Sequence, residues 1–374
     1  MRAELTTTSP LGIAILGTGF GQKVHIPAFQ AHHDTELRVV YHRDLQRAKA
    51  IAQAHDIPTA SDSLDEILAR PDIHGVSLST PPFLHAQMAT KILKAGKHLF
   101  LEKPMALNAT EAKALDQLIQ AQGLQGTINF EFRYVPAWMH LKTLLNNNYI
   151  GQPRLVKLDW LVSGRADPNL PWSWHGSKDL GGGSLGALGS HSFDYIAWLL
   201  GPIRRLTARL ITTIPKRPDP LGNLKIMDAD DTCALTLELV SGACCQVTIS
   251  ATTYAGRGHW LEIYGDRGTL VLGSDHPKDY IHGFQLWGSP GGQPLENLSI
   301  PDHLQFPKTY ADGRIAPTIR VIDHWVQQIR QGQTSAPSFK EGVYAQLLMD
   351  LAHQSHEMGL WVEVPDLDSF LAEL

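Results

Sequence analysis

The 374-residue chain has few cysteines and no long apolar run. Its three cysteines, Cys233, Cys244 and Cys245, are too few for a disulfide framework and poorly spaced for a zinc site. We therefore predict buried thiols in a reducing compartment and no bound metal. No apolar stretch approaches the ~20 residues that a membrane helix needs. Residues 1–10 are polar and lack the apolar core of a signal peptide. The sequence predicts a cytoplasmic protein that does not bind membranes.

The chain also lacks an excess of positive charge. Lys and Arg total 32 against 37 Asp and Glu, a formal net charge of −5. This balance gives no basic signature for nucleic acid, so we predict no nucleic-acid partner. Apolar residues make up 43% and charged residues 18%, which is typical of a folded protein with sizeable cores. A chain of this length accommodates about two domains.

The N-terminal region carries a dinucleotide-binding pattern. Residues 11–16 form an apolar run, which predicts a parallel strand covered on both faces. The run leads into Gly17-Thr18-Gly19-Phe20-Gly21 and a predicted helix over 23–33. Gly17 permits the tight turn, and Gly19 lets the backbone approach a pyrophosphate at the helix N-terminus. Gly21 stands one position earlier than the usual third glycine. The alternative is a glycine-rich turn without a ligand.

The end of the second predicted strand, 37–41, bears on the choice of cofactor. An NAD enzyme usually places an acid there, on the ribose 2′-hydroxyl. This chain has His42-Arg43 instead, and Asp44 comes two positions late. We therefore predict that NADP is favoured over NAD, with His42 and Arg43 at the 2′-phosphate. The alternative is that Arg43 is merely exposed and either cofactor is accepted.

Alternating strands and helices up to residue 130 predict a doubly wound parallel sheet. Strand 74–79 ends in Ser79-Thr80-Pro81-Pro82, and strand 99–101 delivers Glu102-Lys103-Pro104. Ligands of such sheets bind outside the carboxyl ends of the strands. We therefore expect Ser79 to Pro82 to contact the cofactor and Lys103 to act on a bound molecule. The alternative for Lys103 is a solvated Lys-Glu pair at an ordinary strand end.

The pattern changes after Arg133, where strand-like runs follow one another with hairpin turns between them. These runs and a helix over 185–200 predict an α/β domain with a large, mostly antiparallel open sheet. Residues 215–230 and 288–318 are predicted loops, and 317–331 and 340–358 predicted helices. We divide the chain into a dinucleotide-binding Rossmann domain, 1–130, and a substrate-binding and oligomerisation domain, 131–374. Because the open sheet needs a cover, we expect a homo-oligomer, a dimer or a tetramer.

Over nearly its whole length the chain resembles the Gfo/Idh/MocA family, named for glucose–fructose oxidoreductase and inositol dehydrogenase. The resemblance implies a nicotinamide cofactor, further contacts to it from His85, Glu102 and Lys103, and oxidation or reduction of a hydroxyl or ketone, often on a sugar or cyclitol. The motifs that carry the resemblance are Gly17-Thr18-Gly19, Ser79-Thr80-Pro81-Pro82 with His85, Gly96-Lys97-His98 leading to Glu102-Lys103-Pro104, Gly181-Gly182-Gly183, Gly189-Ser190-His191 with Asp194, and Trp198-Leu199-Leu200-Gly201.

By this resemblance, Lys103 and His191 are the catalytic residues. Hydride transfer requires a proton to leave or reach the substrate oxygen, and a lysine or a histidine can carry it. The family places an aspartate one turn before the histidine, where this chain has Ala187. Ala187, His191 and Asp194 stand at i, i+4 and i+7, so we expect them to share one face of the predicted helix. The alternative for His191 is a structural histidine, and Asp194 is expected to pack the helix.

Further substrate contacts are expected from Trp172, Trp174 and His175, because indoles suit the apolar faces of sugar rings. The alternative is that both tryptophans pack a domain interface. The resemblance adds Arg133 and Tyr134 at the crossover between domains, besides Lys103 and His191. The predicted substrate is a small carbohydrate-like molecule. Two other functions stay open: a non-catalytic NAD(P)-binding regulator, and a reductase of a non-sugar carbonyl such as a diketone or tetrapyrrole.

Overall fold

The structure, a computed structural model, describes residues 9–276 and 279–373. The chain forms two compact units. The first comprises residues up to Glu131 together with Lys308–Val343, and the second comprises Phe132–Pro307 together with the residues from Tyr344 onwards. The division that we expected at residue 130 assigns residues 308–343 to the second domain, whereas in the structure they belong to the first unit.

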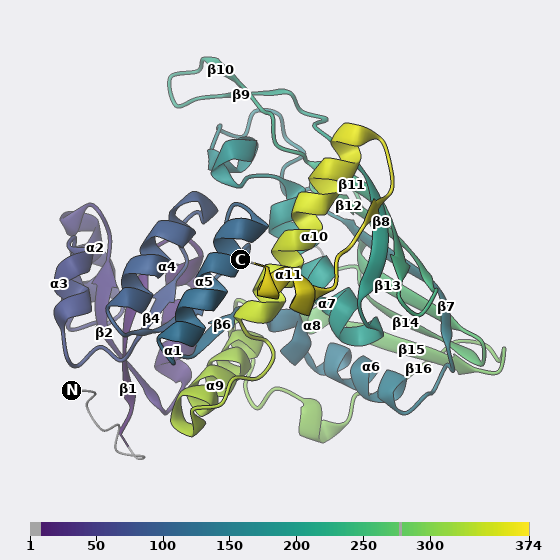
Figure 1. The fold of residues 1–374 in the computed structure, drawn as a ribbon, viewed down its shortest axis with the longest axis horizontal. Coiled ribbons are helices and arrows are strands. Elements are labelled where there is room, and N and C mark those ends of the chain that lie inside the picture. The colour runs from purple at the N-terminus through teal and green to yellow at the C-terminus, as the bar shows by residue number, and fades with distance from the viewer. Residues whose placement is uncertain (1–8, 277–278, 374) are drawn as a thin grey trace. The chain divides into compact units, whose positions relative to one another are not determined.

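The first unit is built on a six-stranded parallel sheet in the order β3-β2-β1-β4-β5-β6 (Figure 1). Every residue of β1 is buried, as expected for a strand covered on both faces. The strand order reverses between β1 and β4, which is where a doubly wound sheet binds ligands. The predicted Rossmann sheet is confirmed. Its strands are β1 (Leu11–Leu16), β2 (Thr35–Tyr41), β3 (Thr59–Ser61), β4 (Gly75–Leu78), β5 (His98–Leu101) and β6 (Gly126–Ile128).

Helices of this unit begin where side chains cap them. Asp44, Ser63 and Asn108 each accept a hydrogen bond from a backbone N–H of the first turn that follows. The first helix instead opens with a wide π turn, Gly21–His25. The regular helices are α1 (Ile26–Ala31), α2 (Leu45–Ala54), α3 (Leu64–Ala69), α4 (His85–Lys94), α5 (Ala109–Ala121) and α9 (Ile315–Gln331), with a 3₁₀ turn at Pro82–Leu84.

Helix α9 belongs to the first unit because its Trp325 is part of that unit's core. Trp325 is fully buried, with its ring centroid 6.1 Å from that of Phe29 and 5.7 Å from that of Phe100. Its indole N–H donates to the carbonyl of Gln125 at 3.3 Å. A Cβ on Gly75 of β4 would collide with the same indole ring. The sheet and α9 are thus fitted to each other.

The second unit contains a nine-stranded sheet in the order β16-β15-β14-β13-β7-β12-β11-β8-β17. Its pairs are antiparallel except β7 with β12, which confirms the mostly antiparallel sheet. Helices α6, α7 and α10 lie on one side of it (Figure 1). The strands are β7 (Pro153–Leu161), β8 (Ile203–Ile211), β11 (Thr232–Leu239), β12 (Cys244–Ser250), β13 (Gly258–Gly265), β14 (Gly268–Ser274), β15 (Gln285–Pro290), β16 (Glu296–Asn297) and β17 (Val362–Glu363).

Two sequence-based expectations, both for loops, were wrong. Residues 215–230 contain a two-stranded hairpin, β9 (Lys216–Pro218) with β10 (Leu224–Ile226), rather than only loop. The predicted loop 288–318 includes the end of β15, all of β16 and the start of α9. The predicted helix 185–200 is confirmed: a π turn at 185–189 leads directly into α7. The helices are α6 (Pro136–Asn146), α7 (Ser190–Leu200), α8 (Tyr280–Gly283), α10 (Phe339–Met358) and α11 (Leu367–Ala372).

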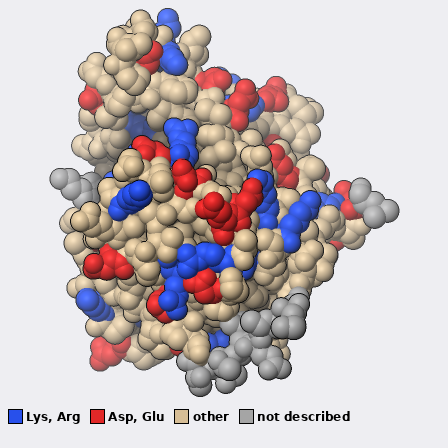
Figure 2. Space-filling model, turned by 90° about the vertical axis from the view of Figure 1, so that its left-hand side faces the viewer, with Lys and Arg blue, Asp and Glu red and all other residues tan. Residues whose placement is uncertain are grey.

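Charges of both signs are mixed on the face that Figure 2 shows, where Lys and Arg are interspersed with Asp and Glu. Within the described part of the chain, no helix is long and apolar enough to cross a membrane, and no group of three or more His, Cys, Asp or Glu is placed to hold a metal ion. The three cysteines are free thiols on or beside β11 and β12.

We predict that Trp325→Ala lowers the free energy of unfolding by about 3–5 kcal/mol, because it removes a fully buried indole that the sheet cannot close over. Urea denaturation measures the change. Trp361→Ala serves as the control, since that side chain is 46% exposed and should cost about 1 kcal/mol or less. Equal losses in the two variants would contradict the assignment of α9 to the core.

Candidate functional site

The glycine turn after β1 is shaped by Ser79, the residue that follows β4. The Ser79 N–H donates to the carbonyl of Leu16 at 2.7 Å, which brings the two strand ends together. Gly17 has φ +108°, and a Cβ there would lie 2.5 Å from the Ser79 backbone. A Cβ on Gly21 would collide with the Ser79 hydroxyl. Gly21 is therefore the glycine that allows close packing of the helix on the sheet. It comes one position earlier than the usual third glycine, and the helix opens there with a π turn.

Gly19 differs from the other two glycines because a Cβ on it would meet nothing within 4 Å. Thr18 and Phe20 beside it are half-buried. On the neighbouring strand end, the buried hydroxyl oxygen of Thr80 has no hydrogen-bond partner among the described residues. Open space over a glycine turn and an unpaired hydroxyl beside it fit a bound dinucleotide, whose pyrophosphate needs close backbone approach.

The end of β2 shows how Asp44 is used. Its carboxylate accepts hydrogen bonds from the N–H groups of Gln46 and Arg47, at 2.9 and 3.3 Å, and so caps α2. Its own N–H donates to Nδ1 of His42 at 3.0 Å. Arg43 is exposed. The acid near this strand end is thus engaged by the helix, while the arginine faces solvent.

His85 connects the ends of β4 and β5. Its Nε2 lies 2.7 Å from the carbonyl of Thr80, and its Nδ1 lies 2.9 Å from the carbonyl of Pro104. Burial lowers the pKa of His85, and the two carbonyls oppose that effect. Pro82 is buried and Pro81 half-buried in the same segment. His85 holds together the two loops in which we predicted cofactor contacts.

Behind Lys103 lies a buried polar network centred on Glu102. One carboxylate oxygen of Glu102 lies 2.9 Å from Nε2 of His25 and accepts from the amide of Asn129 at 2.6 Å. The other accepts from the backbone N–H of Lys103 at 3.2 Å. Burial alone would raise the pKa of Glu102, but these hydrogen bonds and the nearby positive charges bring it below its ordinary value. Glu102 is therefore an anchored carboxylate, and Lys103 is half-buried directly after it.

Glu131 is a second buried carboxyl group near Lys103. Its pKa is raised from 4.5 to about 7, mainly by burial and also by the negative charge of Glu102, while the charge of Lys103 opposes both. The sequence analysis did not single out His25, Asn129 or Glu131. Nothing in their spacing shows that they converge, because they come from three separate segments.

In the second unit, Arg133 forms a buried bidentate pair with Asp194 of α7, at 2.9 and 2.6 Å. Tyr134 is half-buried in the same turn. His191 is buried with its ring centroid 4.9 Å from that of Phe132, in an edge contact. Asp194 thus packs the helix, as expected. Ala187, in the π turn, lines a cavity, and the common face of Ala187, His191 and Asp194 stays a prediction.

The predicted indole loop packs within the second unit. Trp172 donates to the carbonyl of Ile226 at 3.2 Å, and Lys225 lies over its ring at 4.9 Å, so this indole covers the β9–β10 hairpin. Trp174 stacks on His175 with 3.7 Å between ring centroids. His175 lines the same cavity as Ala187.

Two family models match the chain in succession. The model of the NAD-binding Rossmann fold of the Gfo/Idh/MocA oxidoreductases matches residues 11–130, and the model of their C-terminal α/β domain matches residues 142–364. The chain belongs to the Gfo/Idh/MocA oxidoreductase family. Its first unit carries an NAD-binding Rossmann domain, which confirms a nicotinamide dinucleotide as the cofactor class.

Known members of the family align over nearly the full length. An uncharacterized oxidoreductase of Synechocystis sp. is 49% identical over 371 residues, 99% of this chain and 100% of that protein. Levoglucosan dehydrogenase of Pseudarthrobacter phenanthrenivorans is 26% identical over 401 residues, 96% of this chain and 99% of that protein. The solved complex of a levoglucosan dehydrogenase with NADH and levoglucosan shares the fold, with a TM-score of 0.86 at 24% identity, covering 96% of this chain and 100% of that one.

The sequence analysis missed the cavity of about 230 Å³ that Ala187 and His175 line in this family member. Arg165, Arg217, Asp230 and Asp231 complete its polar wall. The run Asp228-Ala229-Asp230-Asp231 and the arginine of the hairpin were the available signals. Both fell in or beside the segment interpreted as loop.

The raised pKa of Glu131 predicts a pH-dependent penalty on stability. Between about pH 4.5 and 7 the unfolded chain loses this proton while the folded chain keeps it, so stability falls as the pH rises. Glu131→Gln removes the penalty. We expect the variant to gain on the order of 1–3 kcal/mol over the unmutated protein at pH 8 and nothing near pH 4.5.

Urea denaturation across this pH range tests the expectation, with Glu66→Gln as the control at an exposed glutamate. A gain that does not vary with pH would show that the carboxyl group does not titrate near neutrality.

Proposed function

We propose that the chain interconverts a hydroxyl and a ketone on a sugar, cyclitol or related polyol, with NADP or NAD as cofactor. The observation that carries the proposal is Lys103, set at the carboxyl end of β5 by the anchored carboxylate of Glu102. A levoglucosan dehydrogenase among the relatives, and the solved complex of such an enzyme with NADH and levoglucosan, support the substrate class.

The residues at the ends of β1 and β4 fit a bound nicotinamide dinucleotide. The turn Gly17–Gly21 would hold the pyrophosphate, with Gly19 at the open position, and the Thr80 hydroxyl would contact the same ligand. Ser79 shapes the turn, and His85 fixes the loops after β4 and β5. When bound, the nicotinamide accepts or supplies the hydride. His42 and Arg43 would meet the 2′-phosphate of NADP.

We assign to Lys103 the transfer of the proton to and from the substrate oxygen. Oxidation of a hydroxyl releases a proton from the substrate oxygen, and the Lys103 amine would accept it; reduction returns it. Glu102 accepts the backbone N–H of Lys103, which orients the residue. His191 is the second proton carrier, and in this chain Ala187 replaces the carboxylate that the family sets one turn before it. Arg133, Tyr134, Trp172, Trp174 and His175 remain proposed substrate contacts.

A substrate screen tests the function. Levoglucosan, inositol and a panel of sugars and polyols are incubated with NAD or NADP while the nicotinamide absorbance is followed. Turnover of any of these compounds supports the proposal. Tight cofactor binding without turnover would favour a non-catalytic regulator, and turnover of a diketone alone would favour a reductase of non-sugar carbonyls.

We predict that Lys103→Met abolishes turnover and leaves cofactor affinity nearly unchanged, since the glycine turn holds the dinucleotide. His191→Ala should cost roughly the 10²-fold low end of acid–base effects. Single-turnover hydride transfer compares the two, and Lys94→Met on the exposed side of α4 is the control. If His191→Ala proves as inactive as Lys103→Met, the histidine is the main proton carrier.

We also predict that NADPH binds more tightly than NADH and that Arg43→Ala weakens NADPH selectively. The expected loss is ~1–2 kcal/mol, the value of one charge-assisted contact. Calorimetric titration of both cofactors measures it, with Lys49→Ala on α2 as the control. Tighter binding of NADH by the unmutated protein would contradict the assignment of Arg43.

A further inference from the structure

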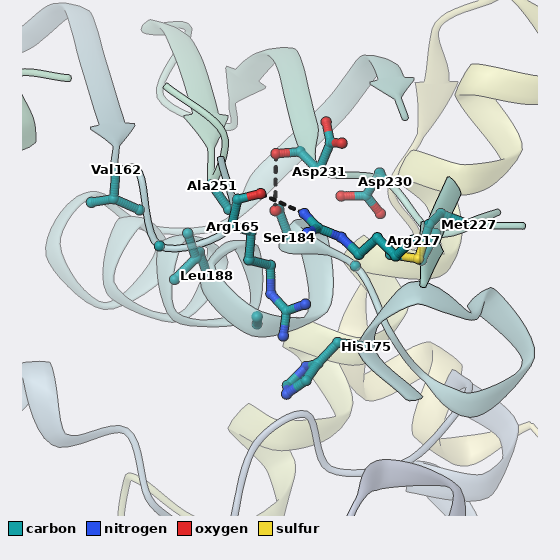
Figure 3. Close-up of a pocket in the computed structure, with 14 residues that line it drawn as sticks. Val162, Arg165, His175, Ser184, Leu188, Arg217, Met227, Asp230, Asp231 and Ala251 are labelled. Carbon is teal, nitrogen blue, oxygen red and sulfur yellow. Dashed lines mark hydrogen bonds between the residues drawn. The ribbon is translucent and has the colours of Figure 1, made fainter. Parts of the chain in front are cut away.

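The cavity in the second unit has a cationic side chain extending into it. Arg165 lies in the loop after β7, and Figure 3 shows its guanidinium group directed into the cavity, toward His175. Its backbone N–H donates to the carbonyl of Ala251 at 2.8 Å, which fixes the start of the side chain. A volume of about 230 Å³ exceeds several times the ~30 Å³ that one water occupies. The space therefore admits a carboxylate or phosphate with its adjoining carbon.

Arg217 holds the loop that presents Arg165. Its side chain is buried, at 2% exposure. One terminal nitrogen donates to the carbonyl of Asp167 at 2.5 Å, and the other donates to the carbonyl of Arg165. Its buried Nε has no partner among the described residues. Arg217 is thus a positioning residue that also adds a positive charge beside Arg165.

Two carboxylates in the wall are engaged elsewhere. Asp231 accepts from the N–H groups of Thr213 and Ile214, at 2.9 and 3.0 Å, and Figure 3 shows its carboxylate pointing away from Arg165. Asp230 accepts from the N–H of Leu185 at 2.8 Å and from the thiol of Cys233 at 3.0 Å. In the described part of the chain, neither Arg165 nor Arg217 forms an ion pair with a carboxylate.

This arrangement leaves two neighbouring cations uncompensated. Burial lowers the pKa of Arg165, and the charge of Arg217 lowers it further. An arginine removed from water without an acidic partner is unfavourable, and a planar guanidinium matches a carboxylate or phosphate with two parallel hydrogen bonds. An acidic ligand group would supply the missing charge.

We propose that this cavity is a subsite for an acidic group of the substrate, a carboxylate or a phosphate, and that Arg165 binds it. The proposal rests on the function above, in which the substrate is a sugar or polyol. Ala187 presents only a methyl group to the cavity. Arg165 therefore selects acidic sugars over neutral ones, acting on binding rather than on the chemical step.

Matched neutral and acidic compounds test this subsite. Glucose, glucuronate and glucose 6-phosphate form one set, and galactose, galacturonate and galactose 6-phosphate form another. Calorimetric binding and steady-state turnover are measured with the full chain and cofactor. Within each set, we expect one acidic sugar to be preferred over the neutral sugar by at least about tenfold. Preference for the uronate indicates a carboxylate site, and preference for the 6-phosphate indicates a phosphate site. Neutral sugars bound as well as acidic ones, or no acidic member bound, would overturn the proposal.

Arg165→Gln should remove that preference through KM, with kcat nearly kept, because the contact is equally present in ground and transition states. Arg165→Lys should keep part of it as a point charge. Arg209→Gln, at an exposed arginine of β8, is the control. Ala187→Asp provides a second variant that keeps Arg165: a carboxylate in the wall should weaken the calorimetric binding of acidic sugars relative to neutral ones, and binding is the readout because the same carboxylate stands one turn before His191. Preference unchanged in Arg165→Gln and Ala187→Asp would refute the subsite.

The outcomes separate the subsite from the function. Turnover of neutral and acidic sugars alike upholds the oxidoreductase and overturns the subsite. Arg165-dependent binding of an acidic sugar without turnover of any sugar upholds the acidic site and overturns the proposed reaction.

Discussion

The carboxylate of Glu102 is the constraint on which the first unit's site depends. A buried charge is tolerated only when it is fully hydrogen bonded, and this one draws its donors from distant segments: His25 in the first helical turn, Asn129 after β6 and the Lys103 backbone. The ring of His25 continues to Ser77 of β4, 2.7 Å away. Satisfying one carboxylate thus aligns the carboxyl ends of β4, β5 and β6 with the N-terminal turn of the helix that follows the glycine turn.

Carboxylates play the same organising role in the second unit. Asp230 accepts from the Leu185 N–H and lies against Gly183, where a Cβ would collide with its carboxylate oxygen and where φ is +107°. Asp231 gathers the N–H groups that follow β8. Gly183 is therefore explained by a buried acid that lies against it, and Asp230 and Asp231 form one wall of the cavity that holds Arg165.

What the sequence predicted well was local. The apolar run over 11–16 depends on neighbouring residues, and it produced the expected strand β1. Non-local features escaped it. No pattern near Trp325 says that α9 packs beside Phe29, and the hairpin that carries Arg217 is short and polar.

The return of α9 to the first unit has a consequence for synthesis. The ribosome completes the six parallel strands by residue 128, but Trp325 follows only after the 176 residues of 132–307. At ~5–20 residues per second, that interval lasts roughly 10–35 s. During it the faces of Phe29 and Phe100 that Trp325 covers stay open to solvent. The nascent first unit therefore lacks α9 and exposes part of its core, which makes it a substrate for chaperones that bind apolar surface.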